Sequence, residues 1–134
     1  MCTILTDSEL AGLGIKLATR KSNNRLGEVG CRWAGQPFTL DLERGRDTVA
    51  QYRTRRNDPA FTSFAANTVN GRPGARLSVE SDRHDCTQLI DGGPVGLAVS
   101  VAQSALYTGP PIDSCAEAMR IAQMIEPRLP KGGS

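Results

Sequence analysis

Hydrophobic and polar residues alternate through the middle of the chain, and this alternation predicts β-strands. The clearest stretch is FTLDLE at 38–43, where every second side chain is apolar. CRWAG at 31–35 predicts a neighbouring strand with Cys31 and Trp33 on one face. The segment 21–30 is polar and rich in turn-forming residues, so it predicts a loop.

Two glycine-containing turns predict β-hairpins in the second half of the chain. Asn70-Gly71 is the strongest short-range hairpin signal, and it divides residues 63–81 into two strands. Residues 86–103 repeat the pattern around Asp91-Gly92-Gly93. One face of the last strand carries only small residues, namely Gly96, Ala98 and Ser100. Such a face predicts close packing by another element, such as a helix.

A capping pattern near the N-terminus predicts a helix. Thr6 and Glu9 have the spacing of a capping box, in which each side chain binds the backbone N–H of the other residue. Leu5 and Leu10 flank the box at the spacing of a hydrophobic staple. Two glycines within the next four residues weaken the helix, which is expected to be short and to end by about Ala18.

The C-terminal region predicts a second helix. Asp113 or Ser114 can cap it, Ser114 with Glu117 has the spacing of another capping box, and Pro127 ends it. The apolar stripe of this helix comprises Cys115, Ala118, Met119, Ala122 and Ile125.

Together these elements predict an α+β domain. An antiparallel sheet of about six strands is expected, with the N-terminal and C-terminal helices packed on one face. A further short helix is expected near Asp47–Tyr52. The 134 residues suit a single domain, expected over residues 2–130, and residues 131–134 are expected to form a disordered tail.

The composition narrows the classes of partner. The formal net charge is +2 and aromatic residues make up 4% of the chain, so nucleic acid is not an expected partner. No apolar run reaches the roughly 18 to 20 residues that span a bilayer, and residues 1–20 lack the pattern of a signal peptide. No phosphate-binding or dinucleotide-binding loop is found, so no cofactor is expected.

The four cysteines indicate the compartment in which the protein folds. Cys2, Cys31, Cys86 and Cys115 are widely spaced, whereas zinc sites usually bring ligands in close pairs. His84 is the single histidine, which leaves little choice of base for a catalytic thiol. The wide spacing of the cysteines also means that no metal site is expected. Buried free cysteines in a cytosolic protein remain an alternative, but the even count favours two disulfides formed in an oxidising compartment.

Four cysteines permit three pairings, and sequence alone does not choose among them. We expect Cys2–Cys115 with Cys31–Cys86, because domain termini often lie close together and because both central cysteines head a predicted strand. The sequential pairing, Cys2–Cys31 with Cys86–Cys115, is the alternative because both of its loops are shorter.

Charged residues give two candidate sites. Asp82, Asp85 and Asp91 near His84 could form an acid–base or metal cluster, although a solvated loop is the favoured interpretation. Five arginines lie within thirteen residues, and their guanidinium groups suit phosphates or carboxylates. This group comprises Arg44, Arg46, Arg53, Arg55 and Arg56. It predicts either a solvated loop or a surface for an anionic partner.

Several motifs occur in an order that resembles the actinobacterial lipoprotein family called domain of unknown function 3558. They are CTILTDSEL at 2–10, CRW at 31–33, NGRPGA at 70–75, Cys86 at the head of a strand, and IDSCAEA at 112–118. The resemblance covers about residues 2–130. Two departures are Ser114, where family members often have proline before the last cysteine, and Met1, where a proline often precedes the first domain cysteine.

The resemblance implies an exported domain, commonly tethered by an upstream lipobox cysteine through a low-complexity linker. It implies no known activity. No small-residue cleavage site precedes Cys2, so a lipidated cysteine is expected to lie outside this sequence, with Cys2 belonging to the fold. Contact with the membrane is therefore expected only through that outside anchor.

Two classes of function follow. The favoured one is a non-catalytic binding or interaction module at the cell envelope, secreted or membrane-anchored, for an envelope polymer, a small molecule or a protein. The alternative is a small secreted enzyme with a site around His84 and the nearby aspartates. A secreted inhibitor or immunity-type protein differs from the first class only in its target.

Overall fold

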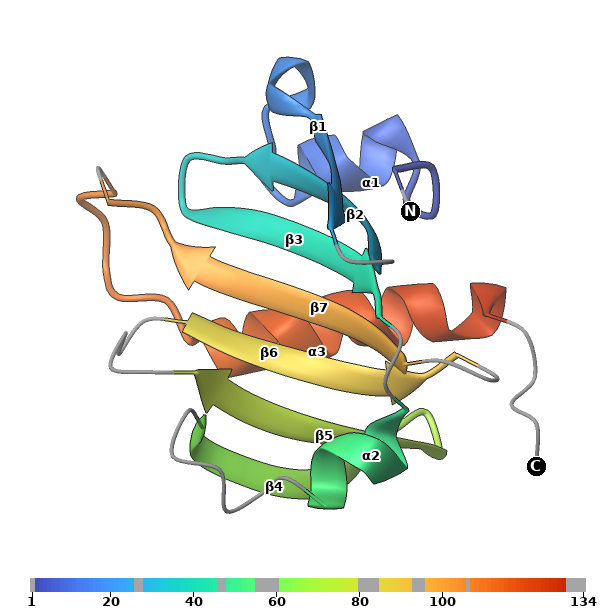
Figure 1. Cartoon of the computed structure of the whole chain (residues 1–134). Coiled ribbons are helices and arrows are strands. Elements are labelled where there is room, and N and C mark those ends of the chain that lie inside the picture. The colour runs from blue at the N-terminus through green and yellow to red at the C-terminus, as the bar shows by residue number, and fades with distance from the viewer. Residues whose placement is uncertain are drawn as a thin grey trace.

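The computed structural model describes residues 2–25, 28–45, 48–54, 61–79, 85–92, 96–105 and 107–129. Within these ranges, seven antiparallel strands form one sheet in the order β1-β2-β3-β7-β6-β5-β4 (Figure 1). The strands are β1 (Lys21–Arg25), β2 (Glu28–Ala34), β3 (Phe38–Arg44), β4 (Phe61–Val69), β5 (Arg72–Val79), β6 (Asp85–Asp91) and β7 (Gly96–Gln103).

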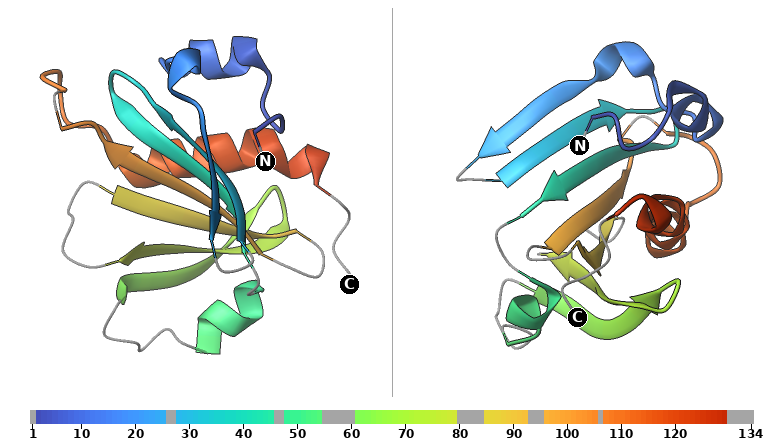
Figure 2. Two further views of the ribbon diagram at one scale, coloured as in Figure 1. Left: turned by 45° about the horizontal axis from the view of Figure 1, so that its top comes forward. Right: turned by 90° about the vertical axis from the view of Figure 1, so that its right-hand side faces the viewer.

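Helices cover both faces of the sheet. They are α1 (Asp7–Gly12), α2 (Val49–Thr54) and α3 (Ser114–Ile125), with 3₁₀ turns η1 (Leu17–Thr19) and η2 (Glu126–Arg128). α3 packs against β6 and β7, α1 lies on the same side of the sheet, and α2 lies on the opposite side against β5 and β6 (Figure 2). The α+β class is therefore confirmed, as is the placement of the N-terminal and C-terminal helices on one face.

The main core lies between the sheet and the helices α1 and α3. Alternation along β3 buries Phe38, Leu40 and Leu42, as predicted. The core also contains Trp33 from β2, Leu10 from α1, Val99 and Val101 from β7, and Ile121 and Ile125 from α3. On the opposite face, a smaller cluster joins Val49 of α2 to Ala75, Leu77 and Leu89, with Ala98 beside it. Ala98, on the small-residue face of β7, therefore packs against this cluster.

The loop predicted over residues 21–30 is wrong, because β1 and the start of β2 form a hairpin there. Pairing runs from Lys21 opposite Arg32 to Arg25 opposite Glu28. A strand at the edge of a sheet can be polar, since backbone hydrogen bonds to one neighbour hold it without a buried face of its own. Hydrophobic alternation therefore gives no signal for β1.

Both predicted glycine hairpins are confirmed. Asn70 and Gly71 have φ angles of 52° and 86°, as a type I′ turn requires. They connect β4 to β5 with Val69 opposite Arg72. β6 and β7 pair from Asp85 opposite Ala102 to Asp91 opposite Gly96.

The start of α1 follows the predicted capping box. The Thr6 hydroxyl accepts the Glu9 N–H at 3.1 Å, and the Glu9 carboxylate accepts the Thr6 N–H at 2.9 Å. Leu5 and Leu10 are both buried in the main core. The helix ends at Gly12, and Gly14 follows with a φ of +78°, so α1 is short as predicted.

The cap of α3 differs in part from the prediction. Asp113 caps the helix by accepting the Ala116 N–H at 3.0 Å. This makes Ala116 the third helical residue, so Ser114 and Glu117 do not form a capping box, and Glu117 pairs with Arg120 instead. The predicted stripe is buried at Ala118, Ala122 and Ile125 and half-buried at Cys115 and Met119, while Ile121 is a fully buried member that the prediction omitted.

A bidentate ion pair joins the two ends of the domain. Both Arg128 terminal nitrogens donate to the Glu9 carboxylate at 2.7 Å, and Arg128 also donates to the Ile4 carbonyl at 2.7 Å. The bonds from Arg128 and the Thr6 N–H lower the pKa of Glu9 to about 2, and the carboxylate raises the pKa of Arg128. The same glutamate thus caps α1 and holds η2.

Both disulfides follow the sequential pairing, so the expected connectivity is wrong. Cys2 bonds Cys31 and Cys86 bonds Cys115, with Cα atoms 5.2 Å and 4.9 Å apart. β3 and β7 separate β2 from β6. At about 4.8 Å per strand, Cys31 and Cys86 stand about 14 Å apart, and a disulfide needs Cα atoms within about 7 Å.

The two ends of the domain do meet, as expected, but the part near the N-terminus is the end of α3 and not its first turn, which carries Cys115. Arg128, just after α3, contacts the N-terminal segment. Cys115 lies in the first turn, and the 12 residues of α3 span about 18 Å. The N-terminal segment therefore reaches β2, and the first turn of α3 reaches β6.

Peptide mapping without reduction should recover one linked peptide pair containing Cys2 and Cys31 and another containing Cys86 and Cys115. Serine replacement of either pair should lower the free energy of unfolding by about 3 to 4 kcal/mol in the chain-entropy model. The two losses should be similar, because both bonds have a sequence separation of 29. A linked peptide that joins Cys2 to Cys115 would contradict the structure.

Glu9→Gln should destabilise the domain above pH 4.5 and much less near pH 2. The pKa of Glu9 is lower in the folded state than its ordinary value of 4.5, so its stabilising effect is present above pH 4.5 and is lost as the pH falls toward 2. Glutamine can keep the capping bond to Thr6, so the variant isolates the charge.

Thermal melts of the wild type and Glu9→Gln across this pH range measure the effect. The control is Glu117→Gln, whose carboxylate pairs with Arg120 within α3 and is worth about 0.3 to 0.5 kcal/mol. A difference between wild type and Glu9→Gln that stays constant from pH 7 to pH 2 would count against the ion pair.

Candidate functional site on the outer face of the sheet

A row of polar side chains crosses the sheet face opposite α3. Strand pairing places Lys21, Arg32, Asp41, Ser100 and Thr87 opposite one another, on β1, β2, β3, β7 and β6 in turn. Residues directly opposite on paired strands point to the same face. This row is therefore presented by five strands whose other face is the main core.

Charge is distributed unevenly along the row. The Arg32 Nε lies 3.8 Å from an Asp41 carboxylate oxygen, and the two side chains are 60% and 24% exposed. Burial raises the pKa of Asp41, and the positive charge of Arg32 partly opposes this rise. The Thr87 and Ser100 hydroxyls share a hydrogen bond of 2.9 Å. The β1–β2 end thus carries the cations, Asp41 provides one carboxylate at the centre, and the β6–β7 end has only hydroxyl groups.

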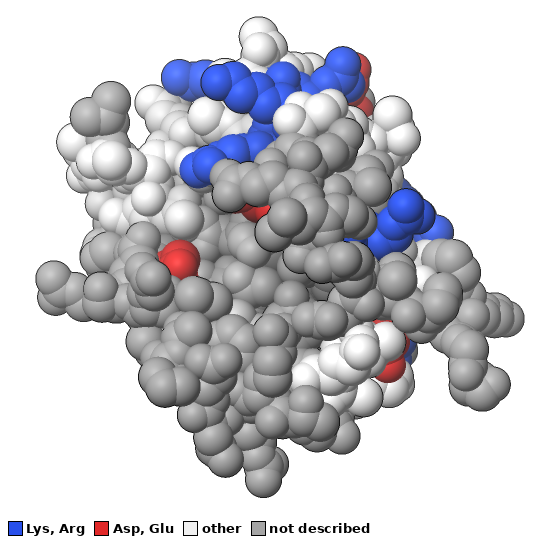
Figure 3. All heavy atoms as spheres, viewed as in Figure 1, with Lys and Arg blue, Asp and Glu red and all other residues white. Residues whose placement is uncertain are grey.

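Exposed cations extend beyond the row at the β1–β2 end. Lys16 and Arg20 flank η1, next to Lys21 and Arg32, and all four side chains are exposed. We call Lys16, Arg20, Lys21 and Arg32 the basic tip. Figure 3 shows Lys and Arg side chains gathered at this end of the molecule. Sequence reasoning missed the tip, because Arg32 joins the three cations of residues 16–21 only once β1 pairs with β2.

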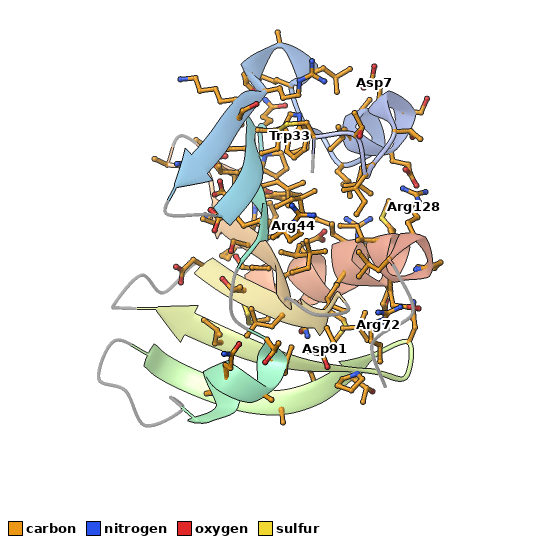
Figure 4. The ribbon with its side chains drawn as sticks, turned by 45° about the vertical axis from the view of Figure 1, so that its right-hand side comes forward. Asp7, Trp33, Arg44, Arg72, Asp91 and Arg128 are labelled. Atoms are coloured by element: carbon orange, nitrogen blue, oxygen red, sulfur yellow. A yellow bond between two sulfur atoms is a disulfide. The ribbon has the colours of Figure 1, made fainter. Side chains whose placement is uncertain are left out.

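The predicted arginine surface is only partly described. Arg44 is the last residue of β3 and is exposed (Figure 4). It shares its strand face with Leu40 and Leu42, so it lies on the α3 side of the sheet, away from the polar row. Arg53 belongs to α2, but its side chain lies outside the described part, as do Arg46, Arg55 and Arg56. The surface as a whole stays a prediction.

The predicted acidic cluster is not brought together in the described region. Asp85 and Asp91 begin and end β6, so the length of the strand separates them. The Asp91 carboxylate accepts the Val49 N–H at 3.3 Å, which holds the start of α2. Asp82 and His84 lie outside the described residues. Within the described ranges, no group of three metal-ligating side chains could hold a metal ion.

Two buried polar groups that sequence reasoning missed stabilise the β4–β5–β6 end. Arg72, whose side chain is 10% exposed, pairs with Glu126 at 3.1 Å and donates to the Asp91 carbonyl at 2.8 Å. The amides of Asn67 and Gln88 bind each other at 2.8 and 3.1 Å. These contacts link strands to each other and to η2, and their polar groups are satisfied within the fold.

Gly74 makes room for the amide pair. A Cβ at this position would lie 2.5 Å from the Leu89 carbonyl and 3.0 Å from the Gln88 amide nitrogen. Only glycine therefore permits this close approach of β5 and β6 beside Gln88. The amides of Asn67 and Gln88 thus bind each other and connect β4 to β6 across β5.

Across the described residues, no helix is both long and apolar enough to cross a membrane. Two disulfides are consistent with a location outside the cytoplasm.

Comparison with known proteins identifies a family. No curated protein and no solved structure matches the chain. A family model described as protein of unknown function DUF3558 matches residues 1–128, nearly the whole chain. The chain therefore belongs to the DUF3558 family.

Proposed function

We propose that this domain is a non-catalytic binding or interaction module that works at the cell envelope, outside the cytoplasm. In this proposal it is the soluble part of a lipoprotein or a secreted protein. Its ligand is an envelope polymer, a small molecule or a protein. The observation that carries the proposal is the pair of disulfides, which uses all four cysteines.

The disulfides support the location. Structural disulfides form and persist in oxidising compartments and are rare where thiols are kept reduced. Here each bond joins a segment outside the sheet to a strand within it: the N-terminus to β2, and α3 to β6. Both bonds therefore connect the main elements of the fold. This favours a domain that folds in an oxidising compartment, where disulfides can form.

The arrangement of polar groups supports a binding role. The outer face presents charged and hydroxyl side chains on a rigid sheet, and the described aspartates of the predicted catalytic cluster lie at opposite ends of β6. A preformed surface loses little entropy on binding. The enzyme alternative would need a site assembled by His84 and residues outside the described part.

Co-sedimentation with envelope fragments tests the binding role. Detergent-extracted fragments, which keep polymers and bound proteins but no bilayer, should retain the oxidised protein saturably. Protein that has been reduced and alkylated should bind less, because the fold is destabilised when both disulfides are broken. Absence of saturable binding would contradict the proposal for a polymer or a protein ligand. Polymer breakdown that His84→Ala abolishes would favour the enzyme, since no second imidazole could replace it.

Charge reversal tests the predicted arginine surface. Replacing Arg53, Arg55 and Arg56 by glutamate should weaken retention on the fragments, because anionic groups would be repelled. The melting temperature should change little, since exposed substitutions usually alter stability by less than about 0.5 kcal/mol each. Arg76→Glu, an exposed arginine on β5, is the control. A loss of folding in place of binding would show that the three arginines are structural.

A further inference from the structure

An exposed leucine stands among the cations of the basic tip. Leu17 is 40% exposed and is the large hydrophobic side chain that the described part of the chain leaves in solvent. Lys16 precedes it in sequence, and Arg20 and Lys21 follow closely. A single exposed leucine is ordinary on a protein surface. An exposed leucine in the same short segment as three exposed cations, with a fourth opposite Lys21 on β2, is a more specific arrangement.

The turn that carries Leu17 is firmly anchored to the end of β2. The Lys16 N–H donates to the Ala34 carbonyl at 2.9 Å, and the Ala34 N–H donates to the Thr19 hydroxyl at 2.8 Å. Next to these bonds, Gly35 lets the segment before the turn approach closely, because a Cβ there would lie 2.9 Å from the Gly14 carbonyl. The exposure of Leu17 is therefore a property of a fixed turn.

The turn projects from one end of the molecule. In Figures 1 and 2, η1 lies beyond β1 at the end of the molecule opposite α2. The turn is therefore placed where it can approach a flat surface. Arg32 joins them from β2, because it lies opposite Lys21 in the strand pairing.

The tip has an excess of positive charge. Within the described residues, one carboxylate, that of Asp41, forms an ion pair with a tip cation, Arg32. Lys21 and Arg32 lie directly opposite on paired strands, where like charges repel. An anionic partner would relieve this repulsion.

We propose that the basic tip docks the domain on an anionic lipid bilayer, with Leu17 entering the headgroup region and the four cations contacting lipid phosphates. A bilayer offers negative charge with an apolar layer directly beneath it, and thus suits both the cations and the leucine. An anionic polysaccharide would satisfy the cations alone. The proposal rests on the proposed function only in placing the domain beside a membrane, and it adds a direct contact to the outside anchor expected from the sequence.

The expected affinity is modest. Each lysine or arginine near an anionic bilayer strengthens binding about fivefold. Inserting the exposed part of one leucine adds a factor of about three to ten. Such a contact would orient a domain that an anchor of the kind implied by the family resemblance holds near the membrane, since stable attachment usually needs two signals.

Vesicle flotation with the oxidised full chain tests the proposal. Vesicles of phosphatidylcholine with about 30 mol% phosphatidylglycerol should float the protein, and vesicles of phosphatidylcholine alone should float far less. Arg20→Gln and Lys21→Gln should each weaken binding about fivefold. Leu17→Ser should weaken it about three- to tenfold. Arg76→Gln and Ala18→Ser, at exposed positions, are the matched controls and should leave it unchanged.

Three results would overturn the proposal. One is equal flotation by neutral and anionic vesicles. Another is a loss in the controls as large as that in the tip variants. The third is a loss in the charge variants with none in Leu17→Ser, which would show that the cations meet the lipid phosphates without entry of the leucine into the headgroup region. Because the envelope fragments contain no bilayer and the vesicles contain no polymer, failure here is distinct from failure of the proposed function.

Discussion

The structure depends on the burial of one face of the sheet beneath α1 and α3. Trp33, Leu40 and Val101 are fully buried on that face, and Ile121 and Ile125 of α3 are buried against it. A strand directs alternate side chains to opposite faces, so the residues between these apolar ones must point the other way. Burial of the apolar residues in the core therefore places the residues of the polar row on the opposite face of the sheet.

The disulfides and the Glu9–Arg128 ion pair hold the helices over this core. One bond attaches the N-terminal segment to β2, and the other attaches the first turn of α3 to β6. The ion pair joins the far end of α3 to α1 through η2. The helical layer is thus fixed at both ends of α3, on the side of the sheet opposite the polar row.

Local signals in the sequence were sufficient for much of the fold. Alternation in 38–43, the Asn70-Gly71 turn and the Thr6 capping box each involve residues close in sequence, and each was confirmed. β1 was missed because all of its residues are polar, so its sequence shows no alternation of hydrophobic and polar positions. The disulfide pairing was wrong because it depends on the order of strands across the sheet, which local patterns do not contain.

The candidate site shows the same limit. Arg20 and Arg32 become neighbours of Lys21 by different routes, one along the chain and one across a hairpin that the sequence did not predict. The acidic cluster looked compact in sequence, but the extended conformation of β6 separates Asp85 from Asp91. Proximity in sequence therefore suggested an acidic cluster that the described residues do not form, and it did not indicate that Arg32 joins the basic tip.

Trapping thiols in intact cells tests the central claim, that the domain works outside the cytoplasm with both disulfides formed. Cells are quenched with acid, the protein is alkylated in denaturant without reduction, and its mass is measured in the envelope and cytosolic fractions. The account predicts protein in the envelope fraction with no alkylated cysteine, since no described cysteine is free. Cytosolic protein with all 4 cysteines alkylated would contradict it.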